Sequence, residues 1–192
     1  MASVLLQRQS KRAYLDRPIP QAALERIIEK TRWAPSSSNS QPWHFVIVQE
    51  PNALAAFRAG LTRGNVWAKA APALIAVAAR EKDDYTRKGD PQVKYFLFDC
   101  GLAVENLLLA AVEEGLLAHP MAGFKTAVVK DALGIPDDYQ LICVISLGYP
   151  GCIDDLDART RVKDEQPRTR NRVEENFHLD HWPAGAVQSG RA

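Results

Sequence analysis

The residues best suited to chemistry lie in the segment 34–45, which reads Ala-Pro-Ser-Ser-Ser-Asn-Ser-Gln-Pro-Trp-His-Phe. Pro35 and Pro42 restrict the backbone at both ends of this segment. Between the prolines, hydroxyls, amides and backbone N–H groups could all be offered to one planar polar ligand. An ordinary polar loop, with Asn39 or Ser40 capping a turn, explains the same residues equally well.

A second polar cluster lies near the start of the chain. Arg8-Gln9-Ser10-Lys11-Arg12 places three positive charges and a hydroxyl within five residues, which alone is best explained as a solvated basic turn. The sequence has no Gly-x-Gly-x-x-Gly after a strand, no Gly-x-x-x-x-Gly-Lys and no Gly-x-Ser-x-Gly, and its four histidines lack metal-ligand spacing. We therefore predict no metal site and name no catalytic side chain.

The composition is that of a globular protein. The 192 residues suffice for one domain with a core, and the net charge of +1 favours neither a nucleic acid nor a membrane as a partner. Cys100, Cys143 and Cys152 are scattered and predict free thiols in a reducing compartment. The N-terminus lacks a signal peptide, and the apolar stretch 96–112 is too short to span a bilayer. We expect a soluble cytoplasmic protein.

The elements that must position these residues follow from apolar spacing. We predict helices over 2–8, 21–32, 53–61 (capped by Asn52), 92–115 and 125–133 (stopped by Gly134), with strands over 45–48, 72–79 and 141–147 and a loop over 119–124. Three buried strands that alternate with helices predict an α/β or α+β domain.

Two further segments have an unusual distribution of apolar residues. The helix over 92–115 is apolar over more than half of its circumference, so it is buried or lies partly in a subunit interface. Its polar exceptions, Asp99 among them, are best explained as satisfied hydrogen-bonding groups. After Cys152 the chain is charged and has only widely spaced apolar residues, so it must lie across another surface or be disordered.

Taken together, the order and spacing of the motifs resemble the nitroreductase family of FMN-dependent oxidoreductases over nearly the whole chain. The motifs are Arg8-x-Ser10-x-Arg12, the segment 34–43, the segment 115–123 and Arg170-x-Arg172. The resemblance implies an α+β fold with a sheet sandwiched by helices, in an intertwined homodimer that binds FMN at its interface. Residues 1–151 would then form the FMN-binding core, and residues 152–192 a C-terminal extension that crosses to the partner subunit.

The resemblance also implies a role for each matching residue. One group would hold the FMN phosphate and ribityl chain: Arg8, Gln9, Ser10, Arg170 and Arg172. Arg12 would lie beside flavin N1 and O2, where a fixed cation raises the reduction potential. A second group would reach the flavin from the partner subunit: Pro35, Ser36, Ser37 and Asn39. Ala122 and Gly123 would present backbone N–H groups toward N5 and O4.

The sequence departs from the family pattern at two places. Many members have a glutamate where this chain has Ala122, so only a backbone role carries over there. Larger members insert a helical excursion over the flavin, where this chain has only the short connection 80–91. The substrate pocket is therefore expected to be open.

The implied activity is transfer of hydride from NAD(P)H through FMN to a small electron-poor acceptor, a nitroaromatic or a quinone, by a ping-pong mechanism. Three alternatives stay open. The same scaffold could carry another flavin reaction, such as enone reduction, dehydrogenation or flavin cleavage. The chain could bind flavin without turnover, or its basic residues could bind an acidic partner.

Overall fold

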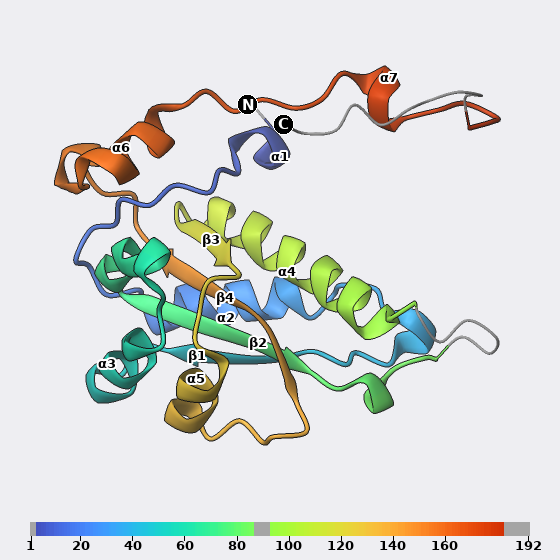
Figure 1. Ribbon diagram of the computed structural model, residues 1–192, viewed down its shortest axis with the longest axis horizontal. Helices are drawn as coiled ribbons and strands as arrows, with labels where there is room; N and C mark the ends of the chain where they lie inside the picture. The colour runs from blue at the N-terminus through green and yellow to red at the C-terminus, as the bar shows by residue number, and fades with distance from the viewer. Residues whose placement is uncertain (1–2, 87–92, 183–192) are drawn as a thin grey trace.

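The computed structural model of the chain describes residues 3–86 and 93–182. At its centre lies a four-stranded antiparallel sheet with the strand order β1-β2-β4-β3 (Figure 1). The strands are β1 (His44–Val48), β2 (Ala73–Ala79), β3 (Leu117–Met121) and β4 (Gln140–Gly148). The strands β2 and β4 are central, so both faces of the sheet can be covered.

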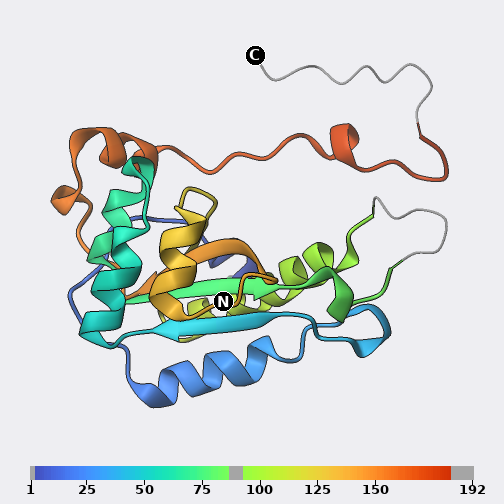
Figure 2. The ribbon, with the colours of Figure 1, turned by 60° about the horizontal axis from the view of Figure 1, so that its bottom comes forward.

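The alternation of side chains along β2 shows how the layers form. Ala73, Ile75 and Val77 pack with the first pair of helices, α2 (Gln21–Thr31) and α4 (Tyr95–Glu113). The intervening residues of β2 face α3 (Pro51–Ala59) and α5 (Thr126–Leu133). Figure 2 shows α2 below the sheet and α3 and α5 above it. Every residue of β2 is buried, and the predicted α+β fold with a sheet between helices is confirmed.

The sequence prediction missed one strand. Residues 119–121 were expected in a loop, but they form part of β3, which pairs with β4 from Leu117↔Gly148 to Met121↔Val144. Pro120 cannot donate a backbone hydrogen bond, so it would disrupt a central strand. β3 is an edge strand, where one side of the backbone has no neighbour, and there proline is tolerated.

The cap of α3 was also predicted wrongly. The helix begins at Pro51, and the carboxylate of Glu50 accepts hydrogen bonds from the backbone N–H groups of Asn52 and Ala53. Asn52 is therefore inside the first turn, and Glu50 is the N-cap. Proline suits the first helical position because its missing N–H would have had no partner within the helix. The prediction for α5 was better, since it ends at Gly134 with φ of 63°.

The long helix α4 contains 19 residues, begins at Tyr95 and packs against α2, β2 and β3. By length and composition alone it could cross a membrane, so the expectation that this apolar stretch is too short was wrong. Asp99 is buried among its apolar residues. The start predicted for this helix, residue 92, and residues 87–91 of the connection 80–91 lie outside the described residues.

Both ends of the described chain lie on the same side of the molecule (Figure 1). The short helix α1 (Val4–Gln7) lies near the segment that contains α6 (Ala158–Glu165) and α7 (Val173–Asn176). Beyond α6, apolar side chains are exposed: Val173, Phe177, Leu179 and Trp182. As expected, this tail does not form a core of its own, and residues 183–192 lie outside the described part.

Candidate functional site

A basic pocket lies where the two ends of the chain meet. Its volume is about 260 Å³. The residues that line it come from the segment after α1 and from the segment that begins in α6: Arg8, Gln9, Ser10, Lys11, Arg12, Lys163, Gln166, Arg168 and Arg170. None of the described residues that line the pocket is acidic, so its electrostatic potential favours an anion.

Hydrogen bonds from Arg168 join the two chain ends that form the pocket. The guanidinium group of Arg168 donates to the carbonyl oxygens of Arg8 (2.6 Å) and Leu6 (2.8 Å), which ties the tail to the end of α1. Arg8 donates to the Ser10 hydroxyl at 3.2 Å. The sequence interpretation did not include Arg168 in the site. The alternating basic residues 168, 170 and 172 were the available signal.

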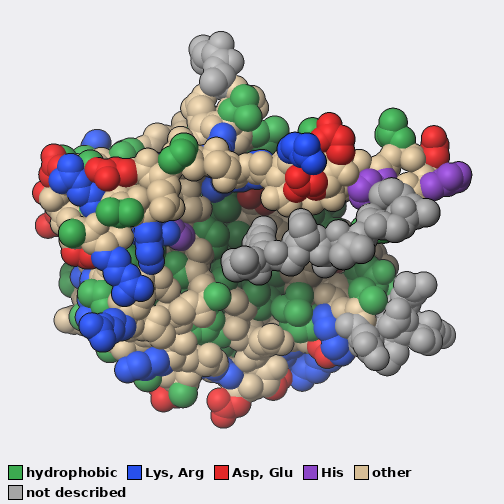
Figure 3. Space-filling view, turned by 45° about the horizontal axis from the view of Figure 1, so that its top comes forward, with side chains coloured by type: hydrophobic (Ala, Val, Ile, Leu, Met, Phe, Trp, Pro, Cys, Tyr) green, Lys and Arg blue, Asp and Glu red, His purple; other side chains and the backbone are tan. Residues whose placement is uncertain are grey.

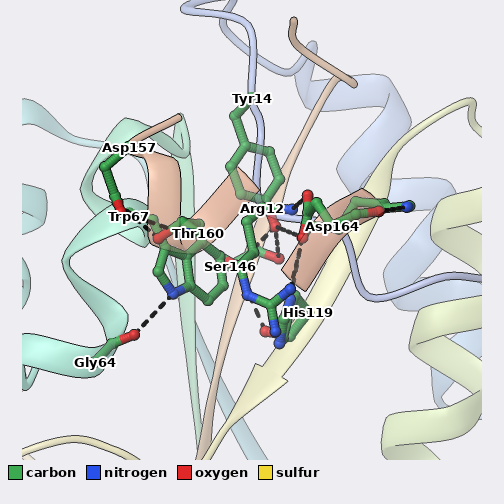
Figure 4. Close-up of polar contacts among 10 residues, drawn as sticks. Arg12, Tyr14, Gly64, Trp67, His119, Ser146, Asp157, Thr160 and Asp164 are labelled. Carbon is green, nitrogen blue, oxygen red and sulfur yellow. Dashed lines mark hydrogen bonds and ion pairs between the residues drawn. The ribbon is translucent and has the colours of Figure 1, made fainter. Parts of the chain in front are cut away.

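Arg12 is fixed by a carboxylate that the sequence did not reveal. Asp164 of α6 accepts a hydrogen bond from the Arg12 guanidinium at 2.6 Å and another from the Arg12 backbone N–H at 2.7 Å (Figure 4). The side chain of Asp164 is only 2% exposed, against 21% for Arg12. Lys11 also donates to the backbone carbonyl of Asp164. The positive charge of Arg12 is therefore oriented and partly neutralised.

Aromatic rings form the wall behind this ion pair. The guanidinium of Arg12 lies 5.5 Å from the centre of the Trp67 ring, and the His119 ring lies 4.6 Å from the same indole. Trp67 also stacks at 6.4 Å with Tyr14, whose hydroxyl contacts the Ser146 hydroxyl at 2.8 Å. Burial is the main cause that raises the pKa of Tyr14, so its phenol stays protonated. These rings keep water away from one side of Arg12.

We expect His119 to remain neutral well below the usual histidine range. Burial lowers its pKa to about 4, the carbonyl of Lys11 opposes this shift, and the charge of Arg12 adds to it. Because the folded pKa lies below the ordinary 6.5, the neutral ring contributes stability above pH 6.5, and this is lost as the pH falls through 4. An NMR titration of the imidazole, assigned with His119→Gln, should have its midpoint near pH 4. A midpoint near 6.5 would contradict this environment.

The segment after β3 holds Ala122 and Gly123 at the end of the strand. The carbonyl oxygen of Gly123 accepts hydrogen bonds from the Thr62 hydroxyl and from the Asn65 amide, each at 2.9 Å. A Cβ atom on Gly123 would lie 2.7 Å from the Asn65 amide nitrogen and 2.8 Å from the Thr62 hydroxyl. A side chain at this position would therefore force the Asn65 and Thr62 side chains to shift. Whether the two N–H groups face a cofactor stays a prediction.

The loop that follows Ala34 lies away from the basic pocket. Figures 1 and 2 place it at the other end of the sheet from α6, beside the start of α4. It contains the short helix η1 (Ser37–Asn39), and the Ser37 N–H donates to the Asp99 carboxylate at 2.6 Å. Within one chain, Pro35, Ser36, Ser37 and Asn39 are thus separated from the residues 8–12.

Arg172 is the one predicted phosphate ligand that the structure does not bring to the pocket. It is not among the lining residues, its side chain is 81% exposed, and it pairs with Glu175 at 3.2 Å. Its role stays a prediction. Arg8, Gln9, Ser10, Arg12 and Arg170 do line the pocket. Fold and site together define a helix-flanked α+β domain with a cationic pocket formed by both of its chain ends.

Comparison with known proteins agrees with this description. The model of the nitroreductase family matches residues 5–149, and the chain belongs to this family. A protein of Archaeoglobus fulgidus with the provisional name NADH dehydrogenase/NAD(P)H nitroreductase is 31% identical over 147 residues, which are 74% of this chain and 81% of the relative. The 4-nitrobenzoate reductase of Pseudomonas putida is 26% identical over 190 residues, with 77% and 84% covered.

A solved structure shows the same similarity in three dimensions. A crystal structure described as an oxidoreductase containing FMN superimposes with a TM-score of 0.83 and 28% sequence identity. The match covers 95% of this chain and 93% of the other. The layered fold described above is therefore shared over almost the full length of both proteins.

Proposed function

We propose that this chain is an FMN-dependent oxidoreductase that takes hydride from NAD(P)H and passes it to a small electron-poor acceptor. The observation that carries the proposal is the basic pocket between the two chain ends. Its support from relatives is twofold. The similar crystal structure is described as containing FMN, and the names of similar proteins refer to NAD(P)H and to reduction of a nitro compound.

The residues present in the pocket fit the phosphate end of FMN. A phosphate dianion prefers several guanidinium and hydroxyl donors, because charge-assisted hydrogen bonds offset its lost hydration. Arg8, Arg170 and the Ser10 hydroxyl supply such donors around a cavity of about 260 Å³. Arg168 shapes the same pocket by fixing the backbone of residues 6–8. The flavin ring would extend from there toward Arg12 and the Gly123 backbone.

When bound, FMN supplies the hydride chemistry, so the protein needs no acid, base or metal of its own. The chain's part is to bind and to orient. Arg12, which Asp164 holds in place, would supply a fixed positive charge where negative charge increases on reduction. Thr62 and Asn65 fix the Gly123 peptide. Because donor and acceptor would use the same open face, we propose that NAD(P)⁺ leaves before the acceptor binds.

We further propose that the functional unit is a homodimer in the cytoplasm, with no nucleic-acid or membrane partner. Two features support a second subunit. Phe98 of α4 and Phe177 of the tail are 62% and 73% exposed, and Figure 3 shows apolar side chains in the hollow below the tail. The loop 35–39 is too far from the basic pocket of its own chain to contact a ligand there, so we propose that it contacts the ligand in the partner's pocket. The tail would likewise pack on the partner subunit.

The decisive experiment is the visible spectrum of the purified protein, before and after anaerobic NADH or NADPH. We expect flavin absorbance that bleaches on addition of one of them and returns on addition of nitrofurazone or a quinone. An enone in the same assay tests the alternative flavin reactions. A protein that binds no FMN would contradict the proposal, and bound flavin that NAD(P)H reduces only negligibly would contradict the reductase activity.

A further inference from the structure

The backbone of the loop 36–41 is strained. Ser38, Asn39 and Gln41 have φ angles of 52°, 57° and 49°, a left-handed conformation that costs free energy for residues other than glycine. Within the loop, the Ser36 hydroxyl accepts from the Gln41 N–H at 2.9 Å. Such a conformation persists only where the surroundings hold it in place.

Two carboxyl groups from other parts of the chain hold this loop. Asp99 of α4, 2% exposed, accepts the Ser37 N–H at 2.6 Å. Asp84, which follows the short helix η3 (Glu81–Asp83), accepts the Ser40 hydroxyl at 2.5 Å. The loop is therefore attached at both of its ends to acidic side chains, one from the core helix and one from the connection after β2.

The two carboxyl groups are close enough that the charge of Asp84 disfavours the charged form of Asp99. The Oδ2 atom of Asp84 is buried, and no described residue gives it a hydrogen-bond donor. In the described part of the chain neither carboxyl forms a salt bridge with a lysine or arginine; the Cys100 thiol is the other titratable group that interacts with both.

We propose that Asp84 and Asp99 are positioning residues that hold the loop 36–41 in the conformation in which it meets the flavin. The statement that the loop meets the flavin rests on the proposed function. The statement that the two carboxyl groups hold the loop does not. Burial is the largest cause that raises the pKa of Asp99 above 3.8, the Ser37 N–H opposes it, and Asp84 adds to it. The contribution to stability is therefore complete below pH 3.8 and is lost as the pH rises through the raised value.

The test compares Asp99→Ala, Asp99→Asn and Asp84→Asn in the full chain, with Glu105→Gln as a matched control, because Glu105 is an exposed acid on the same helix. Two quantities are measured between pH 5 and pH 8. One is the dissociation rate of FMN from the loaded protein. The other is amide hydrogen exchange of residues 36–41 without FMN, corrected for intrinsic exchange at each pH.

Asparagine at either position keeps an oxygen acceptor for the loop, so both rates in the Asn variants should stay within about twofold of the wild type. Asp99→Ala removes the acceptor for Ser37, and both rates should rise roughly tenfold at every pH.

The proposal is overturned if Asp99→Ala behaves like Glu105→Gln, or if Asp99→Asn loosens the loop as much as alanine does. A wild type that binds no FMN would contradict the proposed function alone. The exchange measurement would still decide whether the carboxyl pair holds the loop.

Discussion

Replacement of Asp164 by alanine should lower the free energy of unfolding by about 3 kcal/mol. The Asp164 side chain is 2% exposed and accepts hydrogen bonds from both the guanidinium and the backbone N–H of Arg12. Its removal leaves a largely buried cation without a counter-charge and a backbone donor without an acceptor. Arg12 keeps some contact with water, which limits the decrease in stability. Thermal or denaturant unfolding at fixed protein concentration measures this decrease.

The matched control is Asp154→Ala. Asp154 pairs with Arg161 at 2.7 Å, but its side chain is 65% exposed, and exposed ion pairs contribute less than about 1 kcal/mol. Asp164→Asn keeps an oxygen acceptor and removes the charge, so its stability should lie between the two alanine variants. In the FMN-loaded protein, Asp164→Asn should also raise the reduction potential by roughly 30 mV, since Arg12 is no longer neutralised. Equal stability of the two alanine variants would refute the role given to Asp164.

Replacement of Arg170 by alanine should weaken FMN binding by roughly ten- to a hundredfold and leave riboflavin binding unchanged. Arg170 lines the basic pocket, and riboflavin lacks the phosphate that the pocket is proposed to bind. Arg8→Ala should show the same selectivity. Fluorescence titration of the apoprotein with each flavin measures both affinities, and the FMN affinity should also fall with added salt.

Arg172→Ala is the informative comparison. The family resemblance predicts that Arg172 contacts the phosphate, whereas the structure shows it 81% exposed and paired with Glu175. From the structure we expect less than about a threefold loss of FMN affinity, as for an exposed ion pair. A loss as large as that of Arg170→Ala would support the prediction from the family. If the Arg170 variant weakened FMN and riboflavin equally, the pocket would not be a phosphate site.

Much of the fold could be predicted because its signals are local. Helical spacing marked α2 and α5, and the left-handed residue that ends α5 is the glycine expected there. The apolar run 73–79 marked the central strand. The strand β3 could not be predicted in this way, because proline disfavours a strand in the interior of a sheet. Only the pairing with β4 shows that β3 lies at the edge of the sheet.

The candidate site was predictable in its basic residues and not in its acidic ones. Spacing indicated the segment 8–12, and the family resemblance added Arg170. Nothing near Asp164 in the sequence indicates that it lies against Arg12, which is 152 residues away. Asp99 was recognised as a satisfied polar group, but its partner Ser37 is 62 residues away, and Asp84 was not singled out. Long-range pairing of this kind is a property of the fold and has no local signal.

The position of β2 in the middle of the sheet has a consequence for biosynthesis. Ala73 pairs with Leu147, so this strand leaves the ribosome well before the neighbour that covers one of its edges. A fully apolar strand with an open edge is prone to pair with other chains during that interval. We therefore expect slow, non-local folding, and yields that improve when translation is slowed or a chaperone is supplied.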